Sequence, residues 1–339
     1  MIMKINFDFH FHVHIQQGES SSCVQNAIAD TSESIYFSIY FEKQIKCLSS
    51  QGRFSTCQNY RTAIRSFLNF RQGQDVRLCD VTSKLIGEYE YWLKSIGVSM
   101  GTLSCYLRSL RAVYNKAVME ELVEDKRPFK KCFTGYPKSD KRSITLEEIF
   151  RLKALDLKNK GHVEMVRDIF LFCIYACGMP FVDVAFLRKD QINNEDYLTY
   201  YRHKTHQRIR FRLLPCAKDI VERYSASDSE YVFPFLTESE PEKAFKQYKK
   251  KLCYYNKLLK NLGTQVGIEH PLTSYVSRHT WASLAYEQNT EVSVISKALG
   301  HTSSDTTFVY IKGINDHRLD KANFSIAQQI LDGKEKCGK

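Results

Sequence analysis

The stretch LGHTSSDTTFVY, residues 299–310, decides how this 339-residue chain is interpreted. Gly300 follows the amphipathic run EVSVISKAL and is the kind of residue that ends a helix. His301 comes directly after it, and Tyr310 lies nine residues further on, in or just after a short helix that begins around SSDT. A single tyrosine is most often a packing residue, because burying its ring is favourable. Whether Tyr310 has a chemical role therefore depends on the groups that the rest of the chain supplies.

The composition indicates a globular protein whose charge favours a polyanionic partner, with a merely basic soluble enzyme as the alternative. Hydrophobic residues make up 43% of the chain and charged residues 26%, as is usual for folded proteins. Lysine and arginine number 49 against 38 acidic residues, a net charge of +11, which favours nucleic acid as a partner. The 11 cysteines form no CxxC pair, and the sequence shows neither a secretory signal nor an apolar run long enough for a membrane. We therefore expect a cytoplasmic protein with no membrane partner.

Hydrophobic periodicity predicts two domains joined by a linker. The predicted segments are a leader of residues 1–32, a helical domain of residues 33–124, a basic linker of residues 125–143, a second domain of residues 144–332 and a tail of residues 333–339. Four amphipathic runs fill the first domain, so we expect a small four-helix bundle. Thr82 is the expected N-cap of its third helix.

The second domain is predicted to be mainly helical with one small antiparallel sheet. Thr145 and Glu148 have the spacing of a capping box at its first helix. The alternating run YLTYYRHKTHQRIRFRLLP, residues 197–215, predicts a β-hairpin that turns near His206 and Gln207. Further helices are expected over about 242–262, 273–288, 291–299, 304–311 and 315–332. This mixture is typical of a mostly α domain.

Basic residues mark candidate DNA contacts in the first domain and the linker. Arg61 and Arg65 lie one turn apart on the second predicted helix, and Arg108 and Arg111 do so on the fourth. The linker run EDKRPFKKCFTGYPKSDKR, which includes Lys138, can track phosphates along a duplex. A solvated surface explains the arginine pairs equally well, and a solvated hinge explains the linker.

The leader contains an alternating histidine pattern, INFDFHFHVHI. His10, His12 and His14 would share one face of a strand. An HxH pair at a strand end can bind metal in hydrolases, but that chemistry needs further His and Asp ligands at later strand ends, and the sequence offers no such set. A metal-dependent hydrolase is therefore a rival hypothesis, and a short edge strand or a loose leader is the simpler interpretation.

The second domain supplies the groups that metal-free cleavage of a phosphodiester requires. An attacking tyrosine, a phenol with a pKa of about 10, must lose its proton. Fixed cations must stabilise the charge on the phosphate oxygens, and the departing sugar oxygen needs a proton donor. Lys204 beside the hairpin turn, Arg278 on a helix, His301 and Tyr310 follow one another in the chain. Such a reaction needs no cofactor and no metal.

Two motifs make this combination specific. The run SRHTWAS, residues 277–283, followed by LGHTSSDTTFVY, resembles the tyrosine recombinase (phage integrase) family, whose signature runs R-H, then L-G-H, then Y nine residues later. YRHKT resembles the family's hairpin lysine segment, and CGMPFVDVAFL its first-arginine segment. The likeness covers roughly residues 30–330. It implies a mostly α fold: a SAM-like core-binding bundle, then a mixed α/β catalytic domain with a small antiparallel sheet.

The resemblance implies a role for each matching residue. Tyr310 would be the nucleophile that forms a 3′-phosphotyrosine, and Arg278 would bind the scissile phosphate. Lys204 would protonate the leaving 5′ oxygen, while His301 would hydrogen-bond to the phosphate. Two further residues match supporting positions of the family: Asp183 and His279.

Two residues depart from the family pattern. Pro180 stands where the first arginine is expected, and Tyr275 stands at the histidine of the H-x-x-R motif. Both substitutions resemble a subgroup of integrases and invertases from mobile elements of gut anaerobes. Arg202 lies two residues before Lys204 on the predicted strand, so we hypothesise that it replaces the missing cation, with Arg188 as second choice. Arg202 contacting only backbone phosphates is an equally good interpretation.

The resemblance implies a site-specific recombinase that integrates, excises or inverts double-stranded DNA. It further implies a homotetramer holding two recombination sites, aided in some systems by accessory DNA-bending proteins. The predicted helix 315–332 would pack on its own domain or dock on a neighbouring subunit. Two alternatives share the fold or the chemistry: a DNA-binding protein without strand cleavage, prompted by Pro180 and Tyr275, and a type IB topoisomerase.

Overall fold

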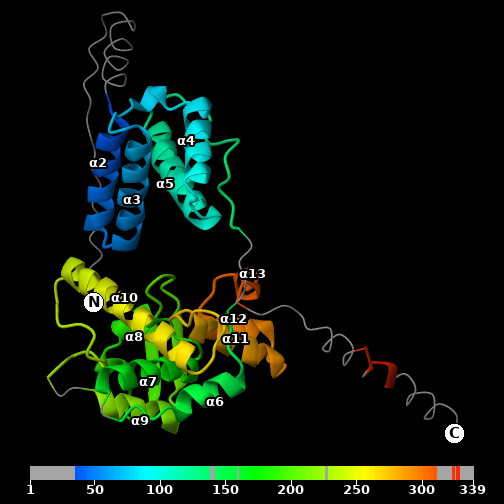
Figure 1. Cartoon of the computed structure of the whole chain (residues 1–339). Helices are drawn as coiled ribbons and strands as arrows, with labels where there is room; N and C mark the ends of the chain where they lie inside the picture. Colours follow the sequence, from blue (N-terminus) through cyan, green and yellow to red (C-terminus); the bar gives the residue numbers. More distant parts are fainter. Residues whose placement is uncertain are drawn as a thin grey trace, which may run out of the picture. The chain divides into compact units, whose positions relative to one another are not determined.

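A computed structural model describes residues 35–137, 142–158, 160–225, 228–310, 323–324 and 326–328. The chain divides into two compact units, Met1–Lys138 and Ser139–Lys339 (Figure 1). The histidine-bearing leader, Lys138 and most of the predicted helix 315–332 lie outside the described residues. Within the described part of the chain, no helix combines the length and the apolar character that crossing a bilayer requires.

The first unit is a bundle of four helices, which confirms the prediction. They are α2 (Phe37–Ser50), α3 (Phe54–Phe70), α4 (Ser83–Ser95) and α5 (Met100–Met119), with a 3-10 turn at Leu78–Asp80 before α4. Thr82 caps α4 as expected, because its hydroxyl accepts a hydrogen bond from the backbone N–H of Leu85 at 3.3 Å. Ser99 caps α5 in the same way.

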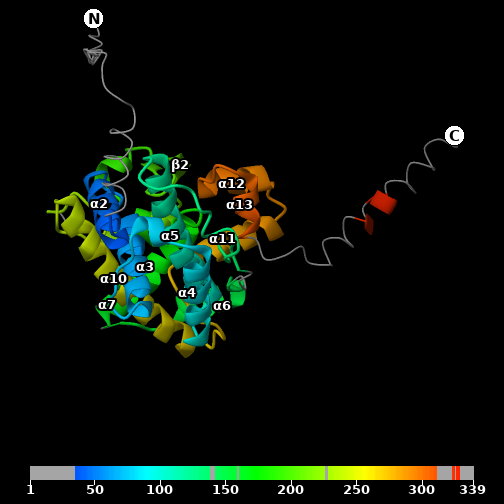
Figure 2. The ribbon, with the colours of Figure 1, turned by 90° about the horizontal axis from the view of Figure 1, so that it is seen from above.

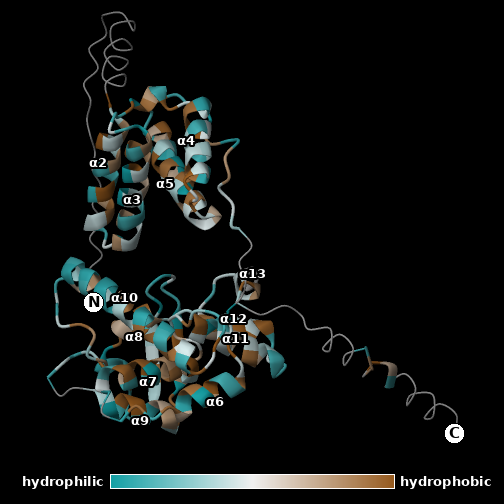
Figure 3. Ribbon diagram, in the orientation of Figure 1, coloured by the Kyte–Doolittle hydropathy of each residue, from teal (hydrophilic) through white to brown (hydrophobic). Residues whose placement is uncertain are grey.

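Aromatic side chains fill the centre of this bundle. Phe67 lies edge-on to Phe37 and to Tyr89, with ring centroids 6.0 and 5.3 Å apart. The Tyr89 hydroxyl is satisfied by a hydrogen bond to the Ser66 hydroxyl at 2.8 Å. The apolar stripes of the helices therefore meet in one core, and hydrophobic and hydrophilic residues alternate along each helix (Figure 3).

The segment predicted to be an extended linker is in large part folded onto α5. Phe129 is buried and its ring lies edge-on to Tyr114 at 6.0 Å. The Ser104 hydroxyl donates a hydrogen bond to the carbonyl of Gly135, and the ring of Tyr136 lies under the guanidinium of Arg108. The expectation of an extended chain over residues 125–143 missed this packing, because proline, glycine and high charge concealed a few well-placed aromatic anchors.

The described part of the second unit is mainly helical, with one two-stranded antiparallel sheet (Figures 1 and 2). Its elements are α6 (Leu146–Ala154), α7 (Gly161–Tyr175), α8 (Phe181–Ala185), a 3-10 turn (Lys189–Gln191), β1 (Tyr197–Tyr201), β2 (Arg208–Arg212), α9 (Pro215–Tyr224), α10 (Pro241–Gln265), α11 (Val276–Glu287), α12 (Val292–Leu299) and α13 (Ser304–Phe308). The capping box of Thr145 and Glu148 is present at α6. The short α8 lies within the segment CGMPFVDVAFL, which resembles the family's first-arginine helix. Helix α9 was not predicted, and its first residue, Pro215, was assigned to the hairpin.

The hairpin forms, but its turn lies earlier than predicted. Tyr201 pairs with Arg208, and the Arg202 N–H donates to the carbonyl of Gln207 at 2.9 Å. Residues 203–206 therefore make the turn, and His206 takes a left-handed φ of 54° that glycine would adopt more easily. Because Gln207 is paired, the predicted turn at His206 and Gln207 is displaced towards the first strand.

Helix α7 runs through the core of the second unit and is buried on nearly all sides. Cys173 is 1% exposed, so its thiol belongs to this core. Asp168, on the same helix, is also buried and accepts hydrogen bonds from Arg167, Arg223 and Tyr224 at 2.8–2.9 Å. This cluster satisfies one buried carboxylate and ties α7 to α9.

Candidate active site

Arg278 is the most deeply buried cation of the second unit's described residues. The side chain is 1% exposed on α11, and its two terminal nitrogens donate to the carbonyls of Gly178 at 3.0 Å and Leu299 at 2.6 Å. Burial lowers the pKa of Arg278, and the nearby charge of Arg202 lowers it further. A Cβ on Gly178, whose φ is 69°, would lie 3.2 Å from the Arg278 Cα. The glycine therefore permits the close approach that places this guanidinium.

His301 contacts Arg278 and is neutral at neutral pH. The Arg278 guanidinium donates to Nε2 at 3.0 Å, so Nδ1 carries the hydrogen and donates to the Thr307 hydroxyl at 2.9 Å. Burial lowers the pKa of His301 to about 4, and the positive charges of Arg278, Arg202 and Lys204 contribute to this shift. The imidazole is thus held in a defined tautomer beside the guanidinium.

The ring of Tyr310 is surrounded by the other predicted site residues. His279 and His301 each lie 4.9 Å from it between ring centroids, and the Arg278 guanidinium carbon lies 5.1 Å from the Tyr310 centroid. The Tyr310 hydroxyl lies 2.7 Å from the hydroxyl of Tyr275. The motifs predicted from the sequence therefore meet around one phenol, which follows the short helix α13.

Tyr275 stands immediately before α11 and is 48% exposed. Burial of its hydroxyl raises the pKa of Tyr275, and the adjacent Tyr310 hydroxyl adds to this rise. At neutral pH the Tyr275 phenol is therefore protonated and can donate a hydrogen bond.

Arg202 brings a second guanidinium to the site. It is 6% exposed, and one terminal nitrogen donates to the carbonyl of Leu299, the same oxygen that Arg278 contacts. Its Nε lies 2.7 Å from a carboxylate oxygen of Asp183, an ion pair that lacks the alignment of a good hydrogen bond. Gly300 adopts the left-handed φ of 64° predicted for a helix stop, and a Cβ there would lie 2.8 Å from the Arg202 side chain.

Asp183 links the start of the hairpin turn to this cluster. Its other carboxylate oxygen accepts a hydrogen bond from the backbone N–H of His203 at 2.9 Å. Burial raises the pKa of Asp183, although the charge of Arg202 opposes the rise. The Thr205 hydroxyl donates to the carbonyl of Gly300 at 3.0 Å, so the turn is fastened at both ends.

Lys204 and Arg188 lie outside the buried cluster. Lys204 is exposed in the turn, and its charge nevertheless contributes to the lowered pKa of His301. The strand face that holds Arg202 therefore does not continue to Lys204. Arg188 pairs with Glu230 at 2.9 Å and with Asp190 at 3.5 Å. Its guanidinium is engaged by carboxylates, so the geometry favours Arg202 over Arg188 as the second cation.

The predicted DNA contacts of the first unit divide into two kinds. Arg61 and Arg65 are exposed one turn apart on α3, as expected. Arg108 and Arg111 are only partly exposed. Arg108 is engaged by Tyr136, and Arg111 donates to the Thr134 hydroxyl at 2.9 Å. These two arginines therefore anchor the segment that follows the bundle in addition to any contact with DNA.

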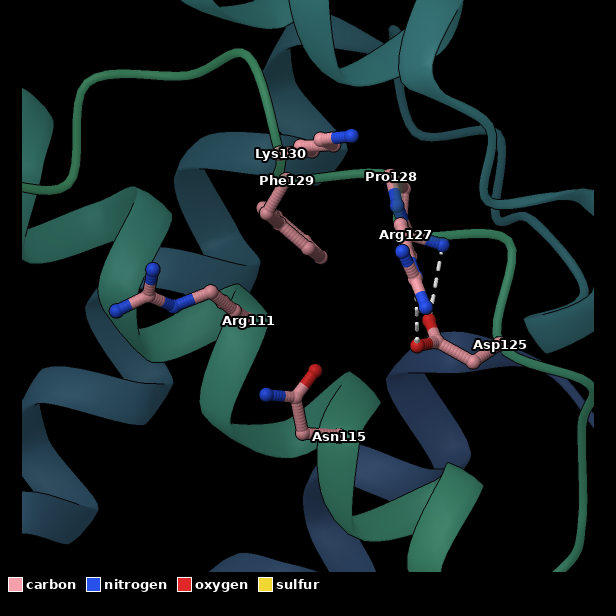
Figure 4. A pocket seen from close by; sticks show the side chains of 7 residues that line it. All are labelled: Arg111, Asn115, Asp125, Arg127, Pro128, Phe129 and Lys130. Atoms are coloured by element: carbon pink, nitrogen blue, oxygen red, sulfur yellow. Dashed lines mark hydrogen bonds and ion pairs between the residues drawn. The ribbon is translucent and has the colours of Figure 1, made fainter.

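An open pocket brings Arg111 together with Arg127 and Lys130 of the predicted basic linker (Figure 4). Its lining side chains are Arg111, Asn115, Asp125, Arg127, Pro128, Phe129 and Lys130. Arg127 pairs loosely with Asp125, at 3.9 Å. Three cations and one carboxylate leave the pocket with a positive charge, which suits an anion such as a phosphate.

Helix α10 carries an exposed lysine surface that the sequence analysis also missed. Lys243, Lys246, Lys250 and Lys257 follow spacings of three, four and seven residues, so they share one face. All four are exposed, and Lys246 pairs with Glu242 at 2.8 Å. The signal for this face in the sequence is the helical spacing of the lysines in the run KAFKQYKKKLCYYNK.

Comparison with protein families covers most of the chain. Residues 36–134 match the phage integrase SAM-like domain. Residues 142–316 match the phage integrase family, and this second match includes every residue of the cluster around Tyr310.

Individual relatives and solved structures are similar to the chain over most of its length. The tyrosine recombinase XerA of Thermococcus onnurineus is 27% identical over 66% of this chain and 75% of its own. XerD of Pseudomonas putida is 24% identical over 78% and 87%. A lambda integrase dimer bound to a COC′ core site has a TM-score of 0.60 at 15% identity, covering 87% of this chain and 82% of its own. The Tn1549 transposon integrase with circular intermediate DNA has a TM-score of 0.61 at 15% identity, covering 87% and 100%.

Proposed function

Because the chain belongs to the phage integrase family and is thus a tyrosine-type site-specific recombinase, we propose that it cleaves and rejoins DNA through a bond between Tyr310 and a phosphate. The observation that carries this proposal is the meeting of Arg278, His301 and Tyr310 in one cluster. Mere DNA binding would not require a phenol enclosed by these groups, so the arrangement favours an active enzyme over a binding protein of the same fold.

The proposed cleavage is a transesterification. The Tyr310 oxygen loses its proton to solvent and attacks the phosphorus, and the bond from phosphorus to the 5′ oxygen breaks. Lys204, in the exposed turn, gives a proton to the leaving 5′ oxygen. The product is a 3′-phosphotyrosine, which keeps the energy of the broken link. Attack by the 5′ hydroxyl of another strand then reverses the step and rejoins the DNA.

Two guanidinium groups would stabilise the phosphate. Arg278 matches the family's conserved position in the R-H motif, while Pro180 leaves the first-arginine position without a cation. Arg202 shares the Leu299 carbonyl with Arg278, so the two groups converge and Arg202 is the candidate replacement. Both are fixed before substrate binds, and such preorganised charges stabilise a transition state most effectively. Asp183 positions Arg202 through their ion pair.

His301 would bind the phosphate as a neutral donor. Its hydrogen is on Nδ1 in this structure, so donation to a phosphate oxygen from Nε2 requires the other tautomer. The Thr307 hydroxyl can donate as well as accept, and it can therefore hold Nδ1 in either tautomer. His279 lies against the ring of Tyr310 and would help to orient it.

Exposed cations would hold the duplex. Arg61 and Arg65 on α3, the basic pocket beside Arg111, and the lysine face of α10 are candidate phosphate contacts, and Lys138 extends this set in sequence. By analogy with a lambda integrase tetramer on a Holliday junction, we propose a homotetramer on two recombination sites. The departures at Pro180 and Tyr275 resemble those of integrases and invertases from mobile elements. We therefore propose that the chain integrates, excises or inverts such an element, aided by DNA-bending proteins.

Trapping the covalent intermediate tests this function. Adducts formed on genomic DNA and recovered after denaturation would identify the site, which is then built into a nicked duplex whose cleaved fragment diffuses away. The wild-type protein should give a band that resists denaturant, and Tyr310→Phe should not. Relaxation of plasmids without any site preference would instead favour a type IB topoisomerase. Retained binding without any adduct would favour the inactive binding protein.

A further inference from the structure

The contact between the two tyrosine hydroxyls is unexplained by the roles assigned so far. Tyr275 and Tyr310 are separated by 35 residues, yet their oxygens lie 2.7 Å apart. Their rings are tilted at 32° with centroids 5.9 Å apart, so they meet at their hydroxyl ends and not by stacking. The resemblance assigns the position of Tyr275 to a histidine of the H-x-x-R motif, which precedes Arg278 by three residues.

The direction of this hydrogen bond follows from the two phenols' surroundings. The oxygen of the nucleophile gains negative charge as its proton leaves, whereas Tyr275 has no reason to ionise, because burial raises its pKa. A protonated phenol is a donor. Either hydroxyl can donate while both phenols are protonated, but once Tyr310 loses its proton only the Tyr275 O–H can donate. The bond then runs from Tyr275 to the Tyr310 oxygen and strengthens as charge develops there.

We propose that Tyr275 acts on the nucleophile: its hydroxyl holds the Tyr310 oxygen in place and stabilises the negative charge that forms there during cleavage. This inference rests on the proposed function and gives Tyr275 a positioning task, since its hydroxyl reaches the attacking oxygen directly. Lys204 remains the proposed proton donor to the leaving 5′ oxygen.

The charged and titratable groups around Tyr275 and Tyr310 determine how the cleavage rate depends on pH. Arg278 and Arg202 act on Tyr275 from α11 and from the end of β1, and both lower its pKa slightly against the larger effect of burial. His279 and His301 face the Tyr310 ring, and His301 has a pKa of about 4, so it stays neutral from weakly acidic to alkaline pH. Lys204, the proposed proton donor to the leaving oxygen, is present in both proteins, so the difference between the profiles of Tyr275→Phe and the wild type reports on the Tyr275 donor.

The experiment measures single-turnover cleavage of the nicked duplex by the full-length chain from pH 6 to pH 10. Tyr275→Phe should slow cleavage at neutral pH about 10- to 100-fold, the value expected for a hydrogen bond to a charged group. It should also move the rise of the profile to higher pH, because the phenolate loses its donor. Affinity for the uncleaved duplex should change less than about twofold, because the donor acts on the protein and not on the DNA.

A sulfur-substituted substrate separates this role from that of the general acid. A duplex with sulfur in place of the bridging 5′ oxygen has a leaving group that needs no proton, so it should restore cleavage by Lys204→Ala. The same duplex should leave Tyr275→Phe slow, because its defect lies on the nucleophile. Since Tyr275 is half-exposed, the phenylalanine variant should keep its unfolding temperature, which shows that folding is intact.

Two outcomes would overturn the inference while leaving the proposed function in place. One is an unchanged pH profile for Tyr275→Phe while the wild type forms an adduct that Tyr310→Phe cannot form. The other is full recovery of Tyr275→Phe on the sulfur-substituted duplex, which would assign Tyr275 to the leaving group. Absence of any wild-type adduct would instead overturn the proposed function itself.

Discussion

The two units differ in what they bury. In the described part of the first unit, the buried polar side chains are neutral: Gln44, Ser104 and Ser109. Among its described residues, the second unit buries five charged side chains: Arg167, Asp168, Asp183, Arg202 and Arg278. Removing a charge from water is costly unless it is paired and hydrogen-bonded, and an apolar residue is often as stabilising. The comparison indicates that the first unit is built for stability and surface binding, whereas the second holds charges in fixed positions for chemistry.

The same contrast appears in how the surface cations are used. Arg61 and Arg65 are exposed on α3, so we expect them to contribute to affinity for DNA. Arg278 and Arg202 are almost inaccessible and converge on one carbonyl. Affinity and rate should therefore respond to substitutions in different units, and this separation can be tested.

The largest expected effect is at Arg278. Arg278→Ala should reduce single-turnover cleavage by about 10³-fold, the cost of removing one preorganised donor from a transition state. Its effect on affinity for the uncleaved duplex should stay below about tenfold, because phosphate contacts elsewhere remain. The matched variant Arg61→Ala/Arg65→Ala should do the reverse, weakening binding while leaving the rate at saturating protein unchanged. Equal loss of affinity and rate in both variants would remove the distinction between the units.

A smaller loss is expected at Arg202. Arg202→Lys keeps a positive charge but cannot reach both the Leu299 carbonyl and Asp183. Cleavage of the nicked duplex should fall about 10- to 100-fold. Arg188→Lys, whose guanidinium is engaged by Glu230, serves as the control and should cleave at the wild-type rate. Unchanged cleavage by Arg202→Lys would show that the missing first arginine has no substitute at this position.

Stability of the second unit should depend on pH through His301. Its pKa of about 4 in the folded chain is lower than the ordinary 6.5, so the unfolded chain binds more protons between these values. Stability from this residue is therefore complete above about pH 6.5 and is lost as the pH falls to about 4. Between these pH values the free energy of unfolding of His301→Gln should fall by about 1–2 kcal/mol less than that of the wild type, a value reduced for the partial exposure of the ring.

The fluorescence of Trp281 reports unfolding of the second unit when Trp92, in the first, is changed to phenylalanine. The difference between this background and the same background with His301→Gln isolates the histidine, since Asp183 titrates in both. An identical pH dependence in the two proteins would show that His301 is not held neutral by its neighbours.

The smallest effect concerns the lysine face of α10. Lys250→Ala/Lys257→Ala removes two exposed cations without breaking an ion pair of the kind that Lys246 makes. The slope of log affinity against log salt should decrease by about 2, and cleavage at saturating protein should be unaffected. Lys153→Ala on α6 is the control. A slope equal to that of the wild type would exclude this face from the phosphate contacts.

Much of the fold was accessible from the sequence because its signals are local. The apolar periodicity of the bundle, the caps at Thr82 and Thr145, and the stop at Gly300 depend on neighbours within one or two turns. The packing of Phe129 against Tyr114 was missed, because a single aromatic anchor in a charged segment has no periodicity. The hairpin was predicted but its turn was displaced, since register depends on which residues pair across the strands.

The candidate site was predicted only as a list of residues. The motifs identified Tyr310, Arg278 and His301, and their approach in space required the fold. The carbonyl of Leu299, which receives both guanidinium groups, has no side-chain signal. The contact between Tyr275 and Tyr310 joins positions that no local pattern connects.

The attachment of DNA to one phenol is the central claim, and peptide mapping of the trapped adduct tests it most directly. The wild-type chain would be denatured on the nicked duplex, digested with nuclease and protease, and analysed by mass spectrometry. The account predicts a nucleotide linked through its 3′ phosphate to the peptide that contains Tyr310. A nucleotide on any other residue, or linkage through a 5′ phosphate, would contradict it.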